Sequence, residues 1–260
     1  MFVNVTCLQI DIDFGNPVKN QQRVKEEITK AISHSPDVIV LPELWSTGYD
    51  LPRLDEIADD NGTYTKHFLS QLAKTHHVNI VGGSVAKKSA TGVTNTMYIF
   101  DRQGNCVGEY SKVHLFKLMD EHLYLQAGNK MGHFELEGVP SSGVVCYDIR
   151  FPEWIRAHTT KGAEIVFVVA EWPLARVEHW RTLLLSRAIE NQCYVVACNR
   201  TGHDPNNEFA GNSMIIDPWG NVVAEAGKEP MQLTANLDLE KVTQVRSQIP
   251  IFADRRTDLY

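Results

Sequence analysis

Short apolar runs alternate with helical patterns along the whole chain, and this alternation limits the fold to a layered α/β architecture. The sequences Asp101–Asn105 and Asp217–Asn221 are typical of hairpin turns, so antiparallel pairs are expected beside the α/β repeats. Strands are predicted at 3–10, 37–41, 78–85, 93–100, 106–110, 142–147, 164–170, 193–199, 213–216 and 222–226. Helices are predicted from Asn16-Pro17 onward and at 64–77, 152–161 and 176–191.

No linker rich in proline or glycine divides the 260 residues, which predicts a single domain over 1–260. The strings 37–45 and 164–172 are alike, each an apolar run followed by a glutamate and a tryptophan. This likeness suggests two related halves, each a sheet covered by helices on one face. The periodicity by itself is equally compatible with a doubly wound sheet.

Composition and charge exclude several classes of protein. The chain is 43% hydrophobic and 22% charged with a net charge of −7, and no long basic run favours a nucleic-acid partner. No apolar stretch reaches the roughly 18 residues of a membrane span, and the N-terminus lacks the basic region of a signal peptide. Five cysteines without a Cys-x-x-Cys pair argue against a disulfide framework and predict a cytoplasmic protein. Four of them are expected to be structural: Cys7, Cys106, Cys193 and Cys198.

The motif Val144–Glu153 places a cysteine between an apolar run and the start of a helix. The run ends at Cys146, and Pro152 suits the first turn of a helix. A thiol at such a turn lies near free backbone N–H groups and a helix dipole, which stabilise a thiolate and an oxyanion. By itself the motif fits a nucleophile and a buried structural cysteine about equally well.

Two further motifs supply a carboxylate and an ammonium group. Glu43 follows an apolar strand and Pro42, at the mouth of the expected sheet, where a carboxylate can act as a general base. Lys112 follows a hairpin among large apolar neighbours, so its side chain either extends to solvent or takes part in chemistry. The joint occurrence of Glu43, Lys112 and Cys146 favours nucleophilic catalysis over three unrelated residues.

Two other hydrolytic arrangements fit the sequence less well. A Cys–His enzyme would need a histidine in a recognisable local motif, and none of the available ones has it: His114, His122, His133, His158 and His179. The spacings typical of zinc ligands, such as His-x-x-x-His, are also missing, so no metal is expected.

Three motifs resemble those of the nitrilase, or carbon–nitrogen hydrolase, superfamily: Leu41–Glu43, Tyr110–Phe116 and Val145–Glu153. The resemblance extends over nearly the whole chain, through 82–84, 95–96, 187–192 and 255–260. It implies a four-layer α-β-β-α sandwich, with which the strand pattern is compatible. It also implies hydrolysis of linear amides, a catalytic triad of Glu43, Lys112 and Cys146, and no cofactor.

The resemblance implies a role for each polar group. Glu43 would serve as base and then acid, Cys146 would form a thioester, and Lys112 with the backbone N–H of Tyr147 would stabilise the oxyanion. Some family members carry a second glutamate shortly after the lysine, which makes Glu121 an auxiliary candidate. A solvated charge pair with its acidic neighbour fits the sequence equally well.

Arginine binds a carboxylate through two parallel hydrogen bonds, so Arg150 and Arg176 are candidates for an anionic substrate. For each arginine, an ion pair within the protein fits slightly better, with Asp148, Glu153 or Glu178 as partner. The expected pocket walls are aromatic: Tyr49, Phe116, Tyr147 and Trp172. Glu171, at the end of another strand, is a candidate for the lining without a catalytic role.

Tyr147-Asp148 stands where nitrilases typically carry Trp-Glu, which favours amides over nitriles. The motifs are most similar to the omega-amidase branch, which hydrolyses small anionic 2-oxo acid amides such as 2-oxoglutaramate. Alternatives are an N-carbamoyl amide hydrolase, an amidase of deaminated glutathione, and a catalytically silent binding or scaffold protein. The resemblance also implies a homodimer in which a tail of about 246–260 crosses to the partner.

Overall fold

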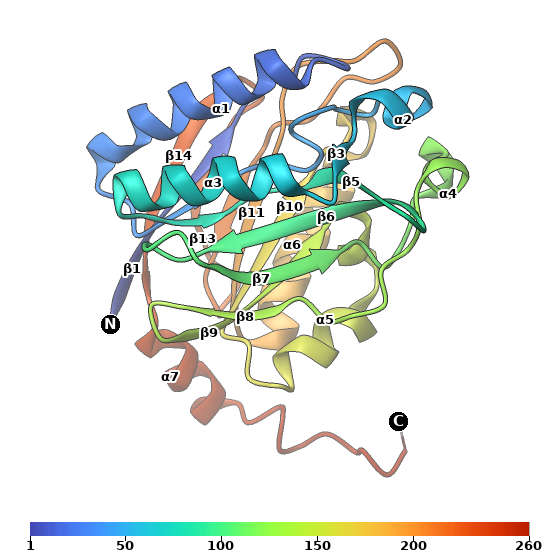
Figure 1. The fold of residues 1–260 in the computed structure, drawn as a ribbon. Coiled ribbons are helices and arrows are strands. Elements are labelled where there is room, and N and C mark those ends of the chain that lie inside the picture. Colours follow the sequence, from blue (N-terminus) through green and yellow to red (C-terminus); the bar gives the residue numbers. More distant parts are fainter. Residues whose placement is uncertain (260) are drawn as a thin grey trace.

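Two mixed β-sheets pack face to face between outer layers of helices in the computed structural model, which describes residues 1–259 (Figure 1). The strand order is β14-β1-β2-β4-β6-β5-β3 in the first sheet, with β7 paired to β6, and β13-β12-β11-β10-β9-β8 in the second. This arrangement is the expected four-layer α-β-β-α sandwich.

The first sheet contains β1 (Phe2–Gln9), β2 (Val38–Val40), β3 (Asp59–Asp60), β4 (Asn79–Val81), β5 (Val85–Ser89), β6 (Gly92–Phe100), β7 (Cys106–Ser111) and β14 (Met231–Asp238). The second contains β8 (His133–Leu136), β9 (Val139–Val145), β10 (Ile165–Ala170), β11 (Tyr194–Asn199), β12 (Met214–Ile216) and β13 (Val222–Glu225). The helices are α1 (Pro17–Ala31), α2 (Leu54–Ile57), α3 (Thr63–His76), α4 (Glu121–Tyr124), α5 (Pro152–Thr159), α6 (Val177–Asn191) and α7 (Glu240–Gln248).

Alternation along β1 explains why two separate cores form. Val5 and Cys7 belong to the core between the two sheets, whereas Leu8 belongs to the core under the outer helices. Successive side chains of a strand point to opposite faces, so a strand that is apolar at nearly every position is buried on both sides. The apolar runs of the sequence therefore predict strands that are covered on two faces.

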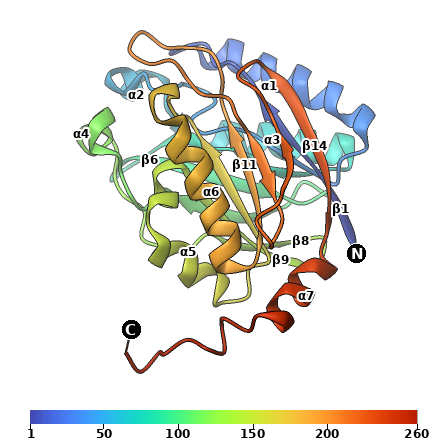
Figure 2. The same ribbon diagram turned by 180° about the vertical axis from the view of Figure 1, so that it is seen from behind.

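Each sheet has helices on its outer face. Helix α1 begins at Pro17 after Asn16, whose side chain accepts a hydrogen bond from the Lys19 N–H at 3.2 Å, and it turns Val24 and Ile28 toward the first sheet. Helices α1 and α3 lie over that sheet in Figure 1, and α5 and α6 cover the second sheet in Figure 2. Between residues 1 and 259, no helix combines the length and apolar character needed to cross a membrane.

The structure corrects several predicted boundaries. The predicted strand 78–85 is two strands, β4 and β5, because a turn at Gly82 and Gly83 separates them. The predicted strand 142–147 ends at Val145, and a 3₁₀ turn follows over Cys146–Arg150. Strands β8 and β14, helix α7 and the short elements β3, α2 and α4 were not predicted, although β14 alternates between apolar and polar residues over its whole length.

The carboxyl ends of parallel strands from both sheets meet at one end of the sandwich. Strand β1 runs parallel to β2 and β2 to β4 in the first sheet, and β9, β10 and β11 are mutually parallel in the second. Glu43 follows β2, Cys146 follows β9, Glu171 follows β10 and Arg200 follows β11. Polar side chains at such strand ends are the usual elements of an α/β site.

The turn at Gly83 holds the loop that carries Glu43. The Ser84 N–H donates to the Pro42 carbonyl at 3.1 Å, and the Leu44 N–H donates to Ser84 Oγ at 2.9 Å. Gly83 has a φ of +57°, and a Cβ atom there would lie 2.0 Å from the Pro42 carbonyl oxygen. This position therefore requires glycine both for its backbone conformation and for its close approach.

We expect Gly83→Ala to lower the free energy of unfolding by about 2 kcal/mol or more, because left-handed strain and a backbone clash act together. Gly227→Ala is the matched control, since a Cβ there meets no atom within 4 Å. Urea unfolding followed by circular dichroism measures both variants. Equal stability of the two would contradict this account of the turn.

Candidate active site

Cys146 occupies a strained turn directly after β9. Its φ is +44°, a left-handed conformation that is uncommon for residues other than glycine, and its side chain is buried. Such a conformation persists only where the surroundings hold it, and it is typical of functional turns. The alternative of an ordinary core cysteine does not explain this strain, although Cys7, Cys193 and Cys198 are buried in the core as expected. Cys106, which was expected to be structural, is exposed.

The buried carboxylate of Asp148 holds the turn of Cys146 in place through hydrogen bonds. Its Oδ2 atom accepts hydrogen bonds from the Val145 N–H at 3.0 Å and from the Tyr110 hydroxyl at 2.7 Å. Its Oδ1 atom accepts the His114 N–H at 3.0 Å and lies 2.8 Å from His114 Nδ1. The same buried carboxylate thus joins the segment after Lys112 to the segment around Cys146, and it explains the clustering of polar residues in both motifs.

Glu43 is fully buried and surrounded by hydrogen-bond donors. Its Oε1 atom accepts from Lys112 Nζ at 2.9 Å, from Asn95 Nδ2 at 2.8 Å and from the Tyr49 hydroxyl at 3.2 Å. Its Oε2 atom accepts the backbone N–H of Glu171 at 2.8 Å. These contacts hold the carboxylate in one orientation, which is the requirement for a positioned base.

Glu121 belongs to the same buried cluster. Its Oε1 atom accepts from Lys112 Nζ at 2.5 Å and from the Tyr49 hydroxyl at 2.5 Å, and its Oε2 atom accepts the Phe116 N–H at 2.7 Å. The alternative of a solvated charge pair is wrong for Glu121, because its side chain is fully buried. Tyr49, predicted as a pocket wall, instead bridges the two carboxylates.

Burial and charge decide the protonation of these groups. Burial and the Glu43 carboxylate raise the pKa of the Cys146 thiol well above its usual value, although Lys112 opposes them. Burial lowers the pKa of Lys112, but Glu121 and Glu43 outweigh it and hold that pKa well above the usual value. The resting site therefore contains a neutral thiol, which needs a base, and a permanent ammonium ion.

A narrow cleft opens beside Cys146. It is lined by Phe116, Met119, Cys146, Tyr147, Arg150, Glu171, Trp172, Pro173 and Arg176. The volume of this cavity is about 10 Å³, which is enough for about one water molecule. A substrate larger than water therefore requires side chains of this lining to move.

The two predicted arginines both line this cleft. Arg150 lies over the Trp172 ring at 4.7 Å, and Arg176 lies over the Phe116 ring at 5.3 Å. Within residues 1–259, neither guanidinium is within 4.0 Å of a carboxylate, so the favoured ion pairs with Asp148, Glu153 and Glu178 are wrong. Asp148 contacts His114 and Tyr110 instead, and Arg150 Nη2 lies 3.4 Å from His179 Nδ1.

Burial lowers the pKa of Arg150, and the neighbouring Arg176 lowers it further. Two cations at one cleft repel each other, and an anion between them would relieve that repulsion. The electrostatics of the lining therefore favour a negatively charged ligand.

Sequence reasoning gave no role to two contributors, Asn95 and Arg200, and it expected Glu171 only in the lining, where the structure places it. Asn95 on β6 donates to Glu43, and Glu171 contributes its backbone N–H to the same carboxylate. Arg200 is fully buried and donates to Glu171 Oε2 at 3.0 Å. A buried arginine is rare unless it is paired, but its burial is visible only in the folded chain. The sequence pattern predicts only that a strand ends at Asn199, directly before Arg200.

Comparisons with known proteins agree with this geometry. The Carbon-nitrogen hydrolase family matches residues 4–247. The 2-oxoglutaramate amidase of Bacillus subtilis (strain 168) is 57% identical over 256 residues, covering 98% of each chain. The omega-amidase YafV of Yersinia enterocolitica is 36% identical over 222 residues, 84% of each chain. A CN-hydrolase superfamily structure from Xanthomonas campestris superposes with a TM-score of 0.92 at 28% identity, covering 99% of this chain and 98% of the other.

The chain belongs to the carbon-nitrogen hydrolase family, and the resemblance drawn from its motifs is confirmed. It is a hydrolase that acts on carbon–nitrogen bonds other than peptide bonds.

We expect Asp148→Ala to lower the free energy of unfolding by about 3 kcal/mol or more, because several buried donors lose their acceptor together. Activity should fall with it, since the turn of Cys146 loses its support. Glu153→Ala, an exposed acidic residue on the following helix, is the control. Urea unfolding and a rate assay give the two readouts, and a stable, active Asp148→Ala protein would refute the role.

Proposed function

We propose that this hydrolase releases ammonia from the terminal amide of a small 2-oxo acid such as 2-oxoglutaramate, through a thioester on Cys146. The observation that carries the proposal is the buried cluster of Glu43, Lys112 and Cys146 beside a cleft whose two arginines have no carboxylate partner among the described residues. The relatives named as 2-oxoglutaramate amidase and omega-amidase support the choice of substrate.

In the first step, Glu43 accepts the proton of the Cys146 thiol, and the sulfur attacks the amide carbon. The amide oxygen gains the negative charge as a tetrahedral intermediate forms. Lys112 and the backbone N–H of Tyr147 stabilise that oxygen, and oxyanion donors of this kind contribute about 3–4 kcal/mol each. The ammonium ion is already present in the resting site, so no reorganisation is needed when charge develops.

In the second step, the intermediate collapses and the carbon–nitrogen bond breaks. Glu43 gives its proton to the departing nitrogen, so that ammonia leaves and a thioester remains on Cys146. Water then attacks the thioester with Glu43 as base, and the carboxylic acid and the free thiol result.

Glu121 acts in this scheme through its neighbours. Its Oε1 atom accepts hydrogen bonds from Lys112 Nζ and from the Tyr49 hydroxyl, both at 2.5 Å. Lys112 is therefore fixed by two carboxylates, and its proton is retained throughout the reaction. We assign Glu121 an auxiliary role in placing the ammonium ion and the attacking water.

Arg150 and Arg176 are proposed to bind the carboxylate of the substrate, and Phe116, Tyr147 and Trp172 to enclose its carbon chain. Arginine suits this task because its planar fork matches both oxygens of a carboxylate. In this proposal the acid end of a short substrate lies near these cations while its amide lies at Cys146, since all three residues line the same cleft.

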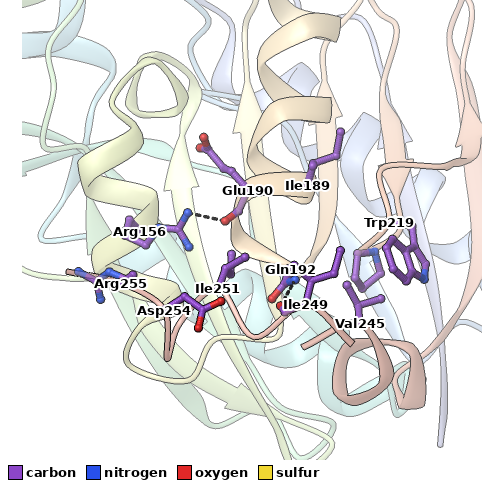
Figure 3. A pocket seen from close by; sticks show the side chains of 11 residues that line it. Arg156, Ile189, Glu190, Gln192, Trp219, Val245, Ile249, Ile251, Asp254 and Arg255 are labelled. Atoms are coloured by element: carbon purple, nitrogen blue, oxygen red, sulfur yellow. Dashed lines mark hydrogen bonds between the residues drawn. The ribbon is translucent and has the colours of Figure 1, made fainter. Parts of the chain in front are cut away.

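We further propose that the enzyme works in the cytoplasm as a homodimer joined through the face of α5, α6 and the tail 246–260, of which the structure describes residues 246–259. On this face a hollow of about 550 Å³ is lined by exposed apolar side chains of Ile189, Trp219 and Ile249 (Figure 3). Exposed apolar patches of this kind are typical of association surfaces. The hollow shares no lining residue with the cleft of Cys146.

A substrate panel tests the proposed function directly. We expect rapid ammonia release from 2-oxoglutaramate and 2-oxosuccinamate, and little from glutamine, an N-carbamoyl amino acid, deaminated glutathione or an aliphatic nitrile. Cys146→Ala should lose about 10⁴-fold or more of the rate, as expected for a missing nucleophile. Failure to turn over the 2-oxo amides would exclude the proposed substrate, and full activity of Cys146→Ala would exclude the proposed nucleophile.

The role of the arginines predicts a change in binding rather than in chemistry. Arg150→Met and Arg176→Met should each raise KM for 2-oxoglutaramate about tenfold or more, because a charge-assisted contact is lost. KM for the neutral pentanamide should change little. Arg181→Met is the control, since Arg181 pairs with Glu225 on the surface. Equal effects on both substrates would show that the arginines serve the structure only.

A further inference from the structure

Behind the cleft, Glu171 and Arg200 form a buried pair that the mechanism does not use. Both side chains are fully buried, and Arg200 Nη1 donates to Glu171 Oε2 at 3.0 Å. Arg200 is held by Asp11 Oδ1 at 2.8 Å and by the carbonyls of Ile12 and Thr201, both at 3.0 Å. These contacts hold the Arg200 guanidinium in place, and through it Glu171 Oε2 is fixed. The Oε1 atom of Glu171 takes no part in this network.

The other oxygen of Glu171 has no hydrogen-bond partner among the described residues, although it is buried. Glu171 lines the cleft together with Cys146, Arg150 and Trp172. A buried polar atom without a partner is costly, and in a native protein it usually has a ligand or a function. An acceptor or donor on the substrate would satisfy this atom.

The charges around Glu171 favour its acid form. The buried cluster combines three carboxyl groups, those of Glu43, Glu121 and Glu171, with the cations Lys112 and Arg200. Burial and Glu43 raise the pKa of Glu171 to about 8, against the opposing effect of Arg200. A second negative charge on the substrate would raise it further. The proton belongs on the oxygen that Arg200 does not occupy.

We propose that Glu171 determines specificity: its Oε1 atom carries a proton and donates a hydrogen bond to an oxygen of the non-reacting, anionic end of the substrate. This inference rests on the proposed function, because it requires an anionic amide. The scissile carbonyl oxygen is already served by Lys112 and the Tyr147 N–H. A buried carboxylic acid that stays neutral so that it can donate a hydrogen bond is a known device of active sites.

The protonation state of Glu171 predicts how substrate binding depends on pH. Below pH 8 the acid donates, whereas above pH 8 the ionised carboxylate loses its donor and repels the anionic substrate. The other charged or titratable groups that face Glu171 lie on several elements. They are Arg200 and Asp204 at and beyond the end of β11, Glu43 and Tyr49 after β2, Cys146 and Arg150 in the 3₁₀ turn, and Arg176 before α6. A comparison of variants that share these groups isolates the effect of Glu171.

The experiment measures KM between pH 6.5 and 9.5 for 2-oxoglutaramate and for neutral pentanamide, in the full-length wild type and in Glu171→Gln. The glutamine keeps the size of the side chain, an acceptor for Arg200 and a donor that does not titrate. Glu164→Gln, which alters a glutamate just before the same strand β10, is the matched control. Thermal unfolding verifies that each variant is folded.

In the wild type and in Glu164→Gln, KM for 2-oxoglutaramate should rise about tenfold above pH 8, relative to KM for pentanamide. In Glu171→Gln it should stay flat and near the wild-type value at pH 7. The same alkaline rise in Glu171→Gln, or a tenfold higher KM at pH 7, would overturn the inference. If Glu171→Gln does not fold, the wild type alone decides, because equal pH profiles for the two substrates refute it. No wild-type turnover of 2-oxoglutaramate would instead overturn the proposed function, and this inference with it.

Discussion

The ammonium group of Lys112, buried without access to water between two buried carboxylates, is the interaction on which the rest of the site depends. Removing one member of such a buried set leaves an uncompensated charge, at a cost of about 3–5 kcal/mol. Glu43 and Glu121 therefore have to be brought to Lys112 by the fold, and Tyr49, Asn95 and the Phe116 N–H complete their hydrogen bonds. The result is a positive charge that is present before any substrate arrives. The Lys112 charge stabilises the buried carboxylates before substrate binds. In our mechanism the same charge stabilises the oxyanion.

The sandwich makes this possible because the carboxyl ends of strands from both sheets come to one place. Glu43 comes from the first sheet, and Cys146 and Glu171 from the second, so the site spans the seam between them. Packing of the two sheets against each other is therefore also what sets the distances between the reacting groups. Asp148 adds a second link across this seam, since it joins the strand-end turn of Cys146 to the loop that carries Lys112.

Several elements of the fold and the site were predictable from local patterns. The apolar runs of β1, β2, β10 and β11 are visible because strands covered on both faces are apolar at consecutive positions. Strand β14 was not predicted, although its strict alternation of apolar and polar residues is typical of an edge strand with one face on the core. Cys146 and Glu43 were found because each follows an apolar run, and Lys112 because it stands among large apolar neighbours. The resemblance of the three motifs to the family joined them into one triad. Glu121 remained ambiguous, and ion pairs were wrongly favoured for Arg150, because partners and burial are properties of the folded chain.

The sequence by itself determined the class of fold, the family and the three groups that motifs reveal, since these depend on neighbouring residues and local backbone preferences. Only the tertiary structure decided which charges are buried together, because the partners are distant along the chain: Lys112 lies 69 residues from Glu43, and the Glu171 N–H lies 128 residues from it. Among the described residues, it also decided that Arg150 and Arg176 have no carboxylate partner at the cleft and that one oxygen of Glu171 has no hydrogen-bond partner. Desolvation and charge pairing act through space rather than along the chain, and they control the protonation on which the chemistry depends.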